Sequence, residues 1–302
     1  FLLFNNVLLV IACATVFAGT LAPLVSDALK LGTLSVGAPY FNPTFMVSML
    51  PLCALLSVGI HAAWKRGRLK DGQRTLLLTF IAAVVLACGL VFGIYSGGGV
   101  LTPVAATLGV WIILSSWVDP LDRWRRGLAV PRSVLGMTVA HTGLGLAVIA
   151  LTTVQSFTIE RDVALAPGAS TAAGGYVFRF EGVAPVEGPN YDGVGATIVV
   201  TRSGAQVAVM KPQKRRYSVQ HQVTSETAIH LSRGSNLLLA LGDDLGAGRW
   251  SVRIQIRPLV SLIWLAALVM AIGGALAASD RRYRSLKLAE TAVSGAAPEH
   301  AG

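Results

Sequence analysis

The sequence predicts a polytopic α-helical membrane protein with six transmembrane helices and an all-β domain inserted before the last of them. Hydrophobic residues make up 53% of the 302 residues and charged residues only 13%, a composition typical of membrane proteins. Six stretches are apolar over the roughly 20 residues that a helix needs to cross a bilayer. Between the fifth and sixth stretches, residues 155–257 have the ordinary polarity of a globular domain.

The six expected spans are Leu3–Val25, Phe45–Trp64, Leu76–Tyr95, Val100–Val118, Val134–Val154 and Leu259–Ala278. Only Ser-Gly-Gly-Gly at residues 96–99 joins the third to the fourth, which predicts a tight hairpin. The connection Leu31–Phe45 is rich in Gly, Pro and aromatic residues, and we expect an ordered loop on the membrane surface. Asp119-Pro120 should end the fourth helix, because proline removes a backbone donor.

The distribution of basic residues predicts the orientation of the spans. Lys65–Arg74 contains five Lys and Arg residues, Asp119–Arg132 contains four, and the tail after Ala278 contains four. The short loops on the opposite side contain only Lys30. The positive-inside rule makes the basic side cytoplasmic, so the β-domain is expected outside, which is the periplasm if the source is a Gram-negative bacterium. The net charge of +10 therefore reflects topology and not nucleic-acid binding.

This organisation predicts four regions: a five-helix transmembrane region at 1–154, the β-domain at 155–257, the last helix at 258–278 and a disordered cytoplasmic tail at 279–302. Apolar and polar residues alternate in 177–182 and 251–256, as in half-buried antiparallel strands. This pattern predicts a small β-sandwich or β-barrel. The expected strands are Phe157–Leu165, Tyr176–Val183, Ala196–Thr201, Ala205–Met210, Leu237–Leu241 and Trp250–Arg257.

Several weaker features of the sequence have ordinary explanations. Cys13, Cys53 and Cys88 lie within apolar spans, where cysteine behaves as a small hydrophobic residue. The basic run Lys211–Arg216 suits a solvated face or contact with an acidic partner. The residues from Asn190 to Gly195 predict a turn-rich loop. His221 and His230 have no metal-ligand spacing.

His141 is the principal candidate for a functional residue, since it is the only ionisable group in Val134–Val154. A histidine in hydrocarbon is costly and is therefore a functional hypothesis. Ala140, Gly143 and Gly145 surround it and let a flat cofactor or another helix approach. From the residues alone, His141 is a packing histidine, a haem-iron ligand or a proton relay. A neutral imidazole ligates iron well.

Several short segments, in order along essentially the whole chain, resemble the C-terminal half of the CcmF family, the haem-lyase subunits of bacterial cytochrome c maturation, or its close paralogue associated with nitrite reductase. They include Phe4–Val10, Gly19–Leu24, Leu34–Asn42, His141–Gly145, Ile159–Asp162, Gly188–Asn190, Ser225–Ile229, Leu239–Gly242, Trp250–Arg253 and Asp280–Tyr283.

This resemblance implies a haem b within the membrane, held by two transmembrane histidines, of which His141 matches one. His61, at the membrane edge, is a poor second ligand, and the better expectation is an upstream histidine. The implied activity joins haem to the Cys-x-x-Cys-His cysteines of apocytochrome c. The implied partners are a periplasmic haem chaperone, apocytochrome c, thioredoxin-like subunits that present it, and the N-terminal part of the same protein.

The chain departs from the full family pattern, because it has no tryptophan-rich external segment and no external pair of haem-presenting histidines. We therefore expect these upstream of Phe1, assign no catalytic residue here, and expect the chain alone to be inactive. Two alternatives are a non-catalytic membrane scaffold that recruits periplasmic partners and a proton-coupled transporter that uses His141.

Overall fold

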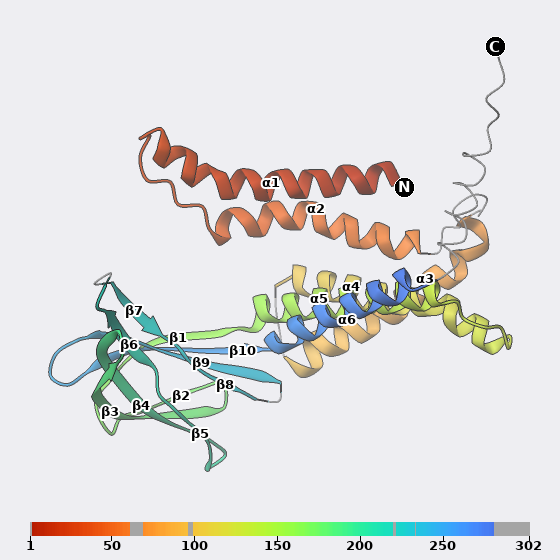
Figure 1. Cartoon of the computed structure of the whole chain (residues 1–302). Helices are drawn as coiled ribbons and strands as arrows, with labels where there is room; N and C mark the ends of the chain where they lie inside the picture. The colour runs from red at the N-terminus through yellow and green to blue at the C-terminus, as the bar shows by residue number, and fades with distance from the viewer. Residues whose placement is uncertain (1, 61–68, 96–98, 220–221, 233, 281–302) are drawn as a thin grey trace. The chain divides into compact units, whose positions relative to one another are not determined.

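The computed structural model describes residues 2–60, 69–95, 99–219, 222–232 and 234–280. The chain forms two compact units. One comprises Phe1–Ile149 with Trp264–Gly302, and the other is Ala150–Ile263. Figure 1 shows how the second is inserted in the chain, which leaves α5 into β1 and returns from β10 into α6.

The first unit is helical, and six helices in its described part are long and apolar enough to cross a membrane. The prediction of a polytopic membrane protein with six spans is therefore confirmed. The helices are α1 (Leu2–Ala28), α2 (Ala38–Gly59), α3 (Leu69–Cys88, continued by the π-helical turn Gly89–Ile94), α4 (Leu101–Arg125), α5 (Arg132–Phe157) and α6 (Val260–Ala278).

The expected surface loop Leu31–Phe45 is wrong in its second half, because α2 already begins at Ala38. Pro39 stands in the first turn of this helix, where a missing backbone N–H costs nothing. The Tyr40 hydroxyl donates to the Thr15 carbonyl of α1 at 3.0 Å. Gly19 lies directly against the ring of Tyr40. The aromatic residues of the expected loop therefore dock α2 on α1.

Proline 120 does not end α4, which continues to Arg125. A proline in a helix leaves the carbonyl four residues earlier without its donor, here the carbonyl of Ser116. The hydroxyl of Thr138 on α5 lies 3.1 Å from that carbonyl and shares its proton between it and the Val134 carbonyl, 2.9 Å away. A side chain of a neighbouring helix thus restores the hydrogen bond, as membrane helices commonly do, and the prediction of a helix end at Asp119-Pro120 is wrong.

The second unit is a β-sandwich, confirming an all-β domain. One sheet has the order β1-β10-β9-β8, and the other has β2-β3-β4-β6-β7 with β5 also paired to β4. The strands are β1 (Ile159–Leu165), β2 (Ser170–Ala173), β3 (Tyr176–Gly188), β4 (Tyr191–Arg202), β5 (Ala205–Met210), β6 (Gln213–Tyr217), β7 (Val223–Glu226), β8 (Ala228–Leu231), β9 (Ser235–Asp244) and β10 (Trp250–Pro258).

The β-domain differs from the expectations in three details. The supposed loop from Asn190 to Gly195 is mostly strand, because β3 and β4 meet in a hairpin that pairs Gly188 with Tyr191. Gly193 lets β6 approach closely, since a Cβ there would clash with the Lys214 carbonyl. Phe157 ends α5 rather than starting a strand. The short strands β2, β6, β7 and β8 were not expected, because four or five residues carry little periodicity.

The domain core predicts a strong effect at Phe178. Phe178 is fully buried between the sheets, whereas its neighbour Val177 is 42% exposed on the opposite face of β3. Phe178→Ala should destabilise the domain by about 3–5 kcal/mol, because it leaves a cavity. Val177→Ala, the matched control, should cost less than about 1 kcal/mol. Both effects are measured by heating the purified protein and recording the temperature at which this domain becomes sensitive to protease. Equal losses of stability in the two variants would contradict the strand register.

Candidate functional site

His141 lies in the middle of α5, and its side chain is half-buried. Its Nδ1 is 2.8 Å from the carbonyl oxygen of Met137, one helical turn earlier. A carbonyl can only accept, so Nδ1 carries the proton and donates. In the neutral ring the lone pair then belongs to Nε2, which has no hydrogen-bond partner among the described residues. The ring is therefore in the tautomer that ligates a metal through Nε2.

The glycines beside His141 serve helix packing. A Cβ at Gly143 would lie 2.7 Å from the Met270 backbone nitrogen of α6. A Cβ at Gly145 would meet Ile113 and Gly109 of α4. Of the two expectations for these glycines, close approach of another helix is the one realised. His141 is on the opposite side of α5 from Gly143, because two residues turn a helix by about 200°. It shares a face with Gly145, four residues later, which packs against α4.

Hydrogen bonds between side chains fix α5 against α4 next to His141. The indole Nε1 of Trp117 donates to the hydroxyl of Thr142 at 2.9 Å. Thr142 in turn donates to the carbonyl of Thr138 at 2.8 Å. These polar contacts and the glycine contacts set the rotation of α5 about its own axis, and so the direction in which His141 points.

Asp280 holds the start of α5 from the opposite end of the sequence. Its side chain is 7% exposed, and its carboxylate accepts from the backbone N–H of Ser133 at 2.9 Å. The first N–H groups of a helix have no partner within the helix, and a carboxylate is favourable at that end. No sequence signal indicated this contact, because 147 residues separate the pair.

Of the other histidines considered as ligands, the structure describes only His230. His61 and His221 lie outside the described residues, and His230 is on β8 in the other unit. The described part of the chain contains no group of three or more His, Cys, Asp or Glu that could hold a metal ion. His141 is therefore the one histidine of the described membrane helices.

The basic run Lys211–Arg216 forms most of β6 and is held by partners within the domain. Lys214 is paired with Asp243 on β9, and this hydrogen bond lowers the pKa of the Asp243 carboxyl. Arg216 pairs with Asp192 at 2.7 Å. The guanidinium of Arg215 lies 4.3 Å from the centre of the Tyr191 ring. These contacts favour the interpretation as a solvated face with a structural role.

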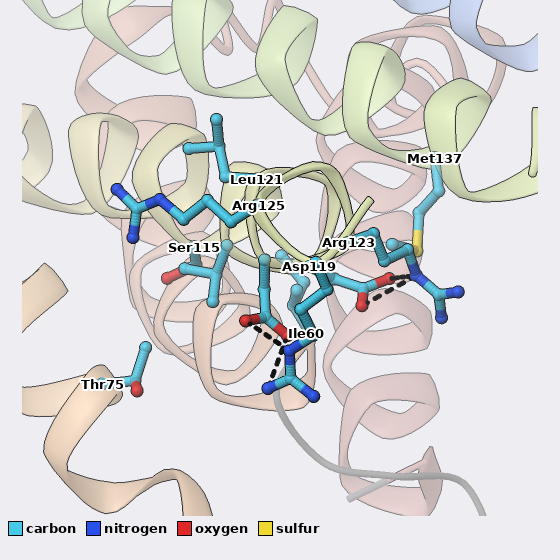
Figure 2. A pocket seen from close by; sticks show the side chains of 11 residues that line it. Ile60, Thr75, Ser115, Asp119, Leu121, Arg123, Arg125 and Met137 are labelled. Atoms are coloured by element: carbon cyan, nitrogen blue, oxygen red, sulfur yellow. Dashed lines mark hydrogen bonds and ion pairs between the residues drawn. The ribbon is translucent and has the colours of Figure 1, made fainter. Parts of the chain in front are cut away.

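A cavity of about 800 Å³ is lined by residues of α3, α4 and α5 and by Ile60, directly after α2. Figure 2 shows its lining, with Arg123 joined to Asp119 and with Ser115 and Thr75 on the other side of the view. The sequence did not indicate this cavity, because its residues come from α3, α4, α5 and the end of α2. Its lining is Ile60, Thr75, Ser115, Val118, Asp119, Leu121, Asp122, Arg123, Arg125, Arg126 and Met137.

Comparison with known proteins identifies the family of this chain. A family model described as the CcmF C-terminal beta-sandwich matches residues 156–258. The cytochrome c-type biogenesis protein CycK of Rhizobium meliloti is 41% identical over 94% of this chain and 43% of its own length. CcmF of Pseudomonas fluorescens is 38% identical over 94% of this chain and 44% of its own length. The chain corresponds to the C-terminal part of a CcmF-family protein.

A solved structure titled Cytochrome c Heme Lyase CcmF has the same fold, with a TM-score of 0.73 over 91% of this chain and 45% of that one. Its sequence identity is 21%, so this likeness bears on the fold alone. The resemblance predicted from the short segments is confirmed. The chain spans less than half the length of the CcmF-family relatives that it matches.

Proposed function

We propose that this chain is part of a cytochrome c haem lyase, in which His141 is one axial ligand of a b-type haem inside the membrane. The naming of the relatives as cytochrome c biogenesis proteins supports the role. The single observation in favour of the ligand is the hydrogen bond from His141 Nδ1 to the Met137 carbonyl at 2.8 Å. Metal-ligating histidines almost always donate their second ring nitrogen in this way, and the bond raises ligand basicity.

The residues around His141 would hold the imidazole in one direction. Thr142 and Trp117 tie α5 to α4, and Gly143 allows the backbone of α5 to touch that of α6. A side chain that must ligate iron needs this support from rigid elements. The bound haem would supply one-electron redox chemistry. Its second axial histidine is expected from the part of the protein upstream of this chain.

The β-domain is proposed to face the periplasm, with the basic loops in the cytoplasm of a bacterial inner membrane. Its proposed partners are the haem chaperone, apocytochrome c and the thioredoxin-like subunits that present it. The chain's three cysteines are free, and Cys53 is buried in a membrane helix. The thiols of the reaction would therefore come from the apocytochrome.

The spectrum of the protein that contains this chain tests the proposal. Purified from membranes, it should carry a b-type haem, and electron paramagnetic resonance of the oxidised form should show a low-spin iron with two imidazole ligands. A haem-free preparation from cells with ample haem would refute haem binding. If the same haem-free preparation produced a pH-dependent solute flux in vesicles, proton-coupled transport would become the favoured function instead of haem lyase activity.

A further inference from the structure

We propose that the cavity at the end of α4 binds the phosphate of an anionic phospholipid. Three arginines and two aspartates line the cavity. Asp119 pairs with Arg123 at 2.9 Å and Asp122 with Arg126 at 3.0 Å. Arg125 has no carboxylate partner among the described residues, and Figure 2 draws it without a dashed line. The cavity therefore offers one uncompensated guanidinium, the group best suited to a phosphate.

A second observation in the same cavity points to a missing ligand. Ser115 lines it and is 1% exposed, and its hydroxyl has no hydrogen-bond partner among the described residues. Buried polar groups are almost always hydrogen-bonded, so this hydroxyl in the cavity wall indicates a partner that the described residues do not supply. Ser115 and Arg125 are ten residues apart on α4, about 15 Å along the helix, so the cavity reaches from the helix end toward its middle.

The position of the cavity favours a lipid over a free anion. Its lining comes from the residue after α2, the second turns of α3 and α5, and the last three turns of α4, which places it toward one end of the proposed spans. Trp124, beside Arg125, is 75% exposed, and tryptophan is enriched at that interface. Basic pockets between membrane helices bind the headgroups of anionic lipids. The apolar cavity residues Ile60, Val118 and Leu121 would contact the glycerol and first acyl carbons.

Native mass spectrometry of the complete protein in nanodiscs tests this. In discs of phosphatidylcholine with phosphatidylglycerol, the protein should retain phosphatidylglycerol selectively. Arg125→Gln should weaken retention about tenfold or more, as expected for one charge-assisted hydrogen bond. Arg132→Gln is the matched control, since Arg132 is exposed at the start of α5 and does not line the cavity; it should retain the lipid.

Further measurements cover a variant that fails to fold and a free phosphate as the ligand. Should Arg125→Gln fail to accumulate, Ser115→Ala, which removes only the buried hydroxyl, should still lower retention several-fold. Equal retention of phosphatidylcholine, or unchanged retention in Arg125→Gln, would overturn the proposal. Displacement of the lipid by millimolar inorganic phosphate would overturn the lipid assignment in favour of a free phosphate. None of these measurements depends on haem, so the proposal stands or fails separately from the haem-lyase role.

Discussion

Replacing His141 with alanine should abolish the membrane haem signal and stop maturation of c-type cytochromes in cells that depend on this protein. Loss of a residue that merely supports a metal ligand already costs about 10–100-fold in metal affinity or activity. If His141 is the proposed ligand, its loss should therefore cost at least about 100-fold. Haem-staining of the cytochromes and the optical spectrum of the purified variant measure the two effects.

His230→Ala is the matched control for this substitution. His230 is a histidine of the same chain on β8, outside the membrane helices, and its loss should leave both readouts unchanged. Exogenous imidazole should restore part of the low-spin haem signal in His141→Ala, because the cavity left by the side chain admits a free imidazole. Normal haem content and normal maturation in His141→Ala would remove His141 as a ligand.

Replacing Gly143 with leucine should prevent the membrane unit from accumulating in folded form. Even the Cβ of the new side chain would lie 2.7 Å from the Met270 nitrogen and 2.8 Å from the Ala266 carbonyl of α6. Both are backbone atoms, so α5 and α6 must separate. Overpacking of this kind typically costs about 1–3 kcal/mol or more, and small residues are what allow membrane helices to pack this closely. The yield of monodisperse protein in detergent measures the loss.

Gly274→Leu provides the control for this prediction. Gly274 lies on the same pair of helices, but a Cβ there meets nothing within 4 Å. The yield and melting temperature of that variant should match those of the parent protein. If both leucine variants behaved alike, the close packing of α5 on α6 at Gly143 would be wrong.

Sequence was sufficient wherever the signal is local. Apolar stretches of membrane-spanning length predict helices regardless of what surrounds them, and a helix was found at each of the six expected spans. The bounds were less well predicted, since α2 begins at Ala38 instead of Phe45 and α4 continues to Arg125 instead of Val118. The alternation at Val177-Phe178-Arg179-Phe180 predicted one strand with a buried and an exposed face, as observed. The rarity of a histidine in an apolar span was enough to single out His141.

Only the tertiary structure could show those features that depend on a contact with another segment of the chain. Pro120 ends an isolated helix, yet α4 continues because Thr138 of α5 supplies the missing donor. Gly143 and Gly145 suited a cofactor or a helix equally well in sequence, and contacts with α6 and α4 show that they pack helices. The Asp280 cap on α5 and the cavity around Ser115 and Arg125 join residues far apart in the chain. Hydrophobicity is a property of a segment, whereas a hydrogen bond or a close contact belongs to a pair, and the fold alone chooses the partners.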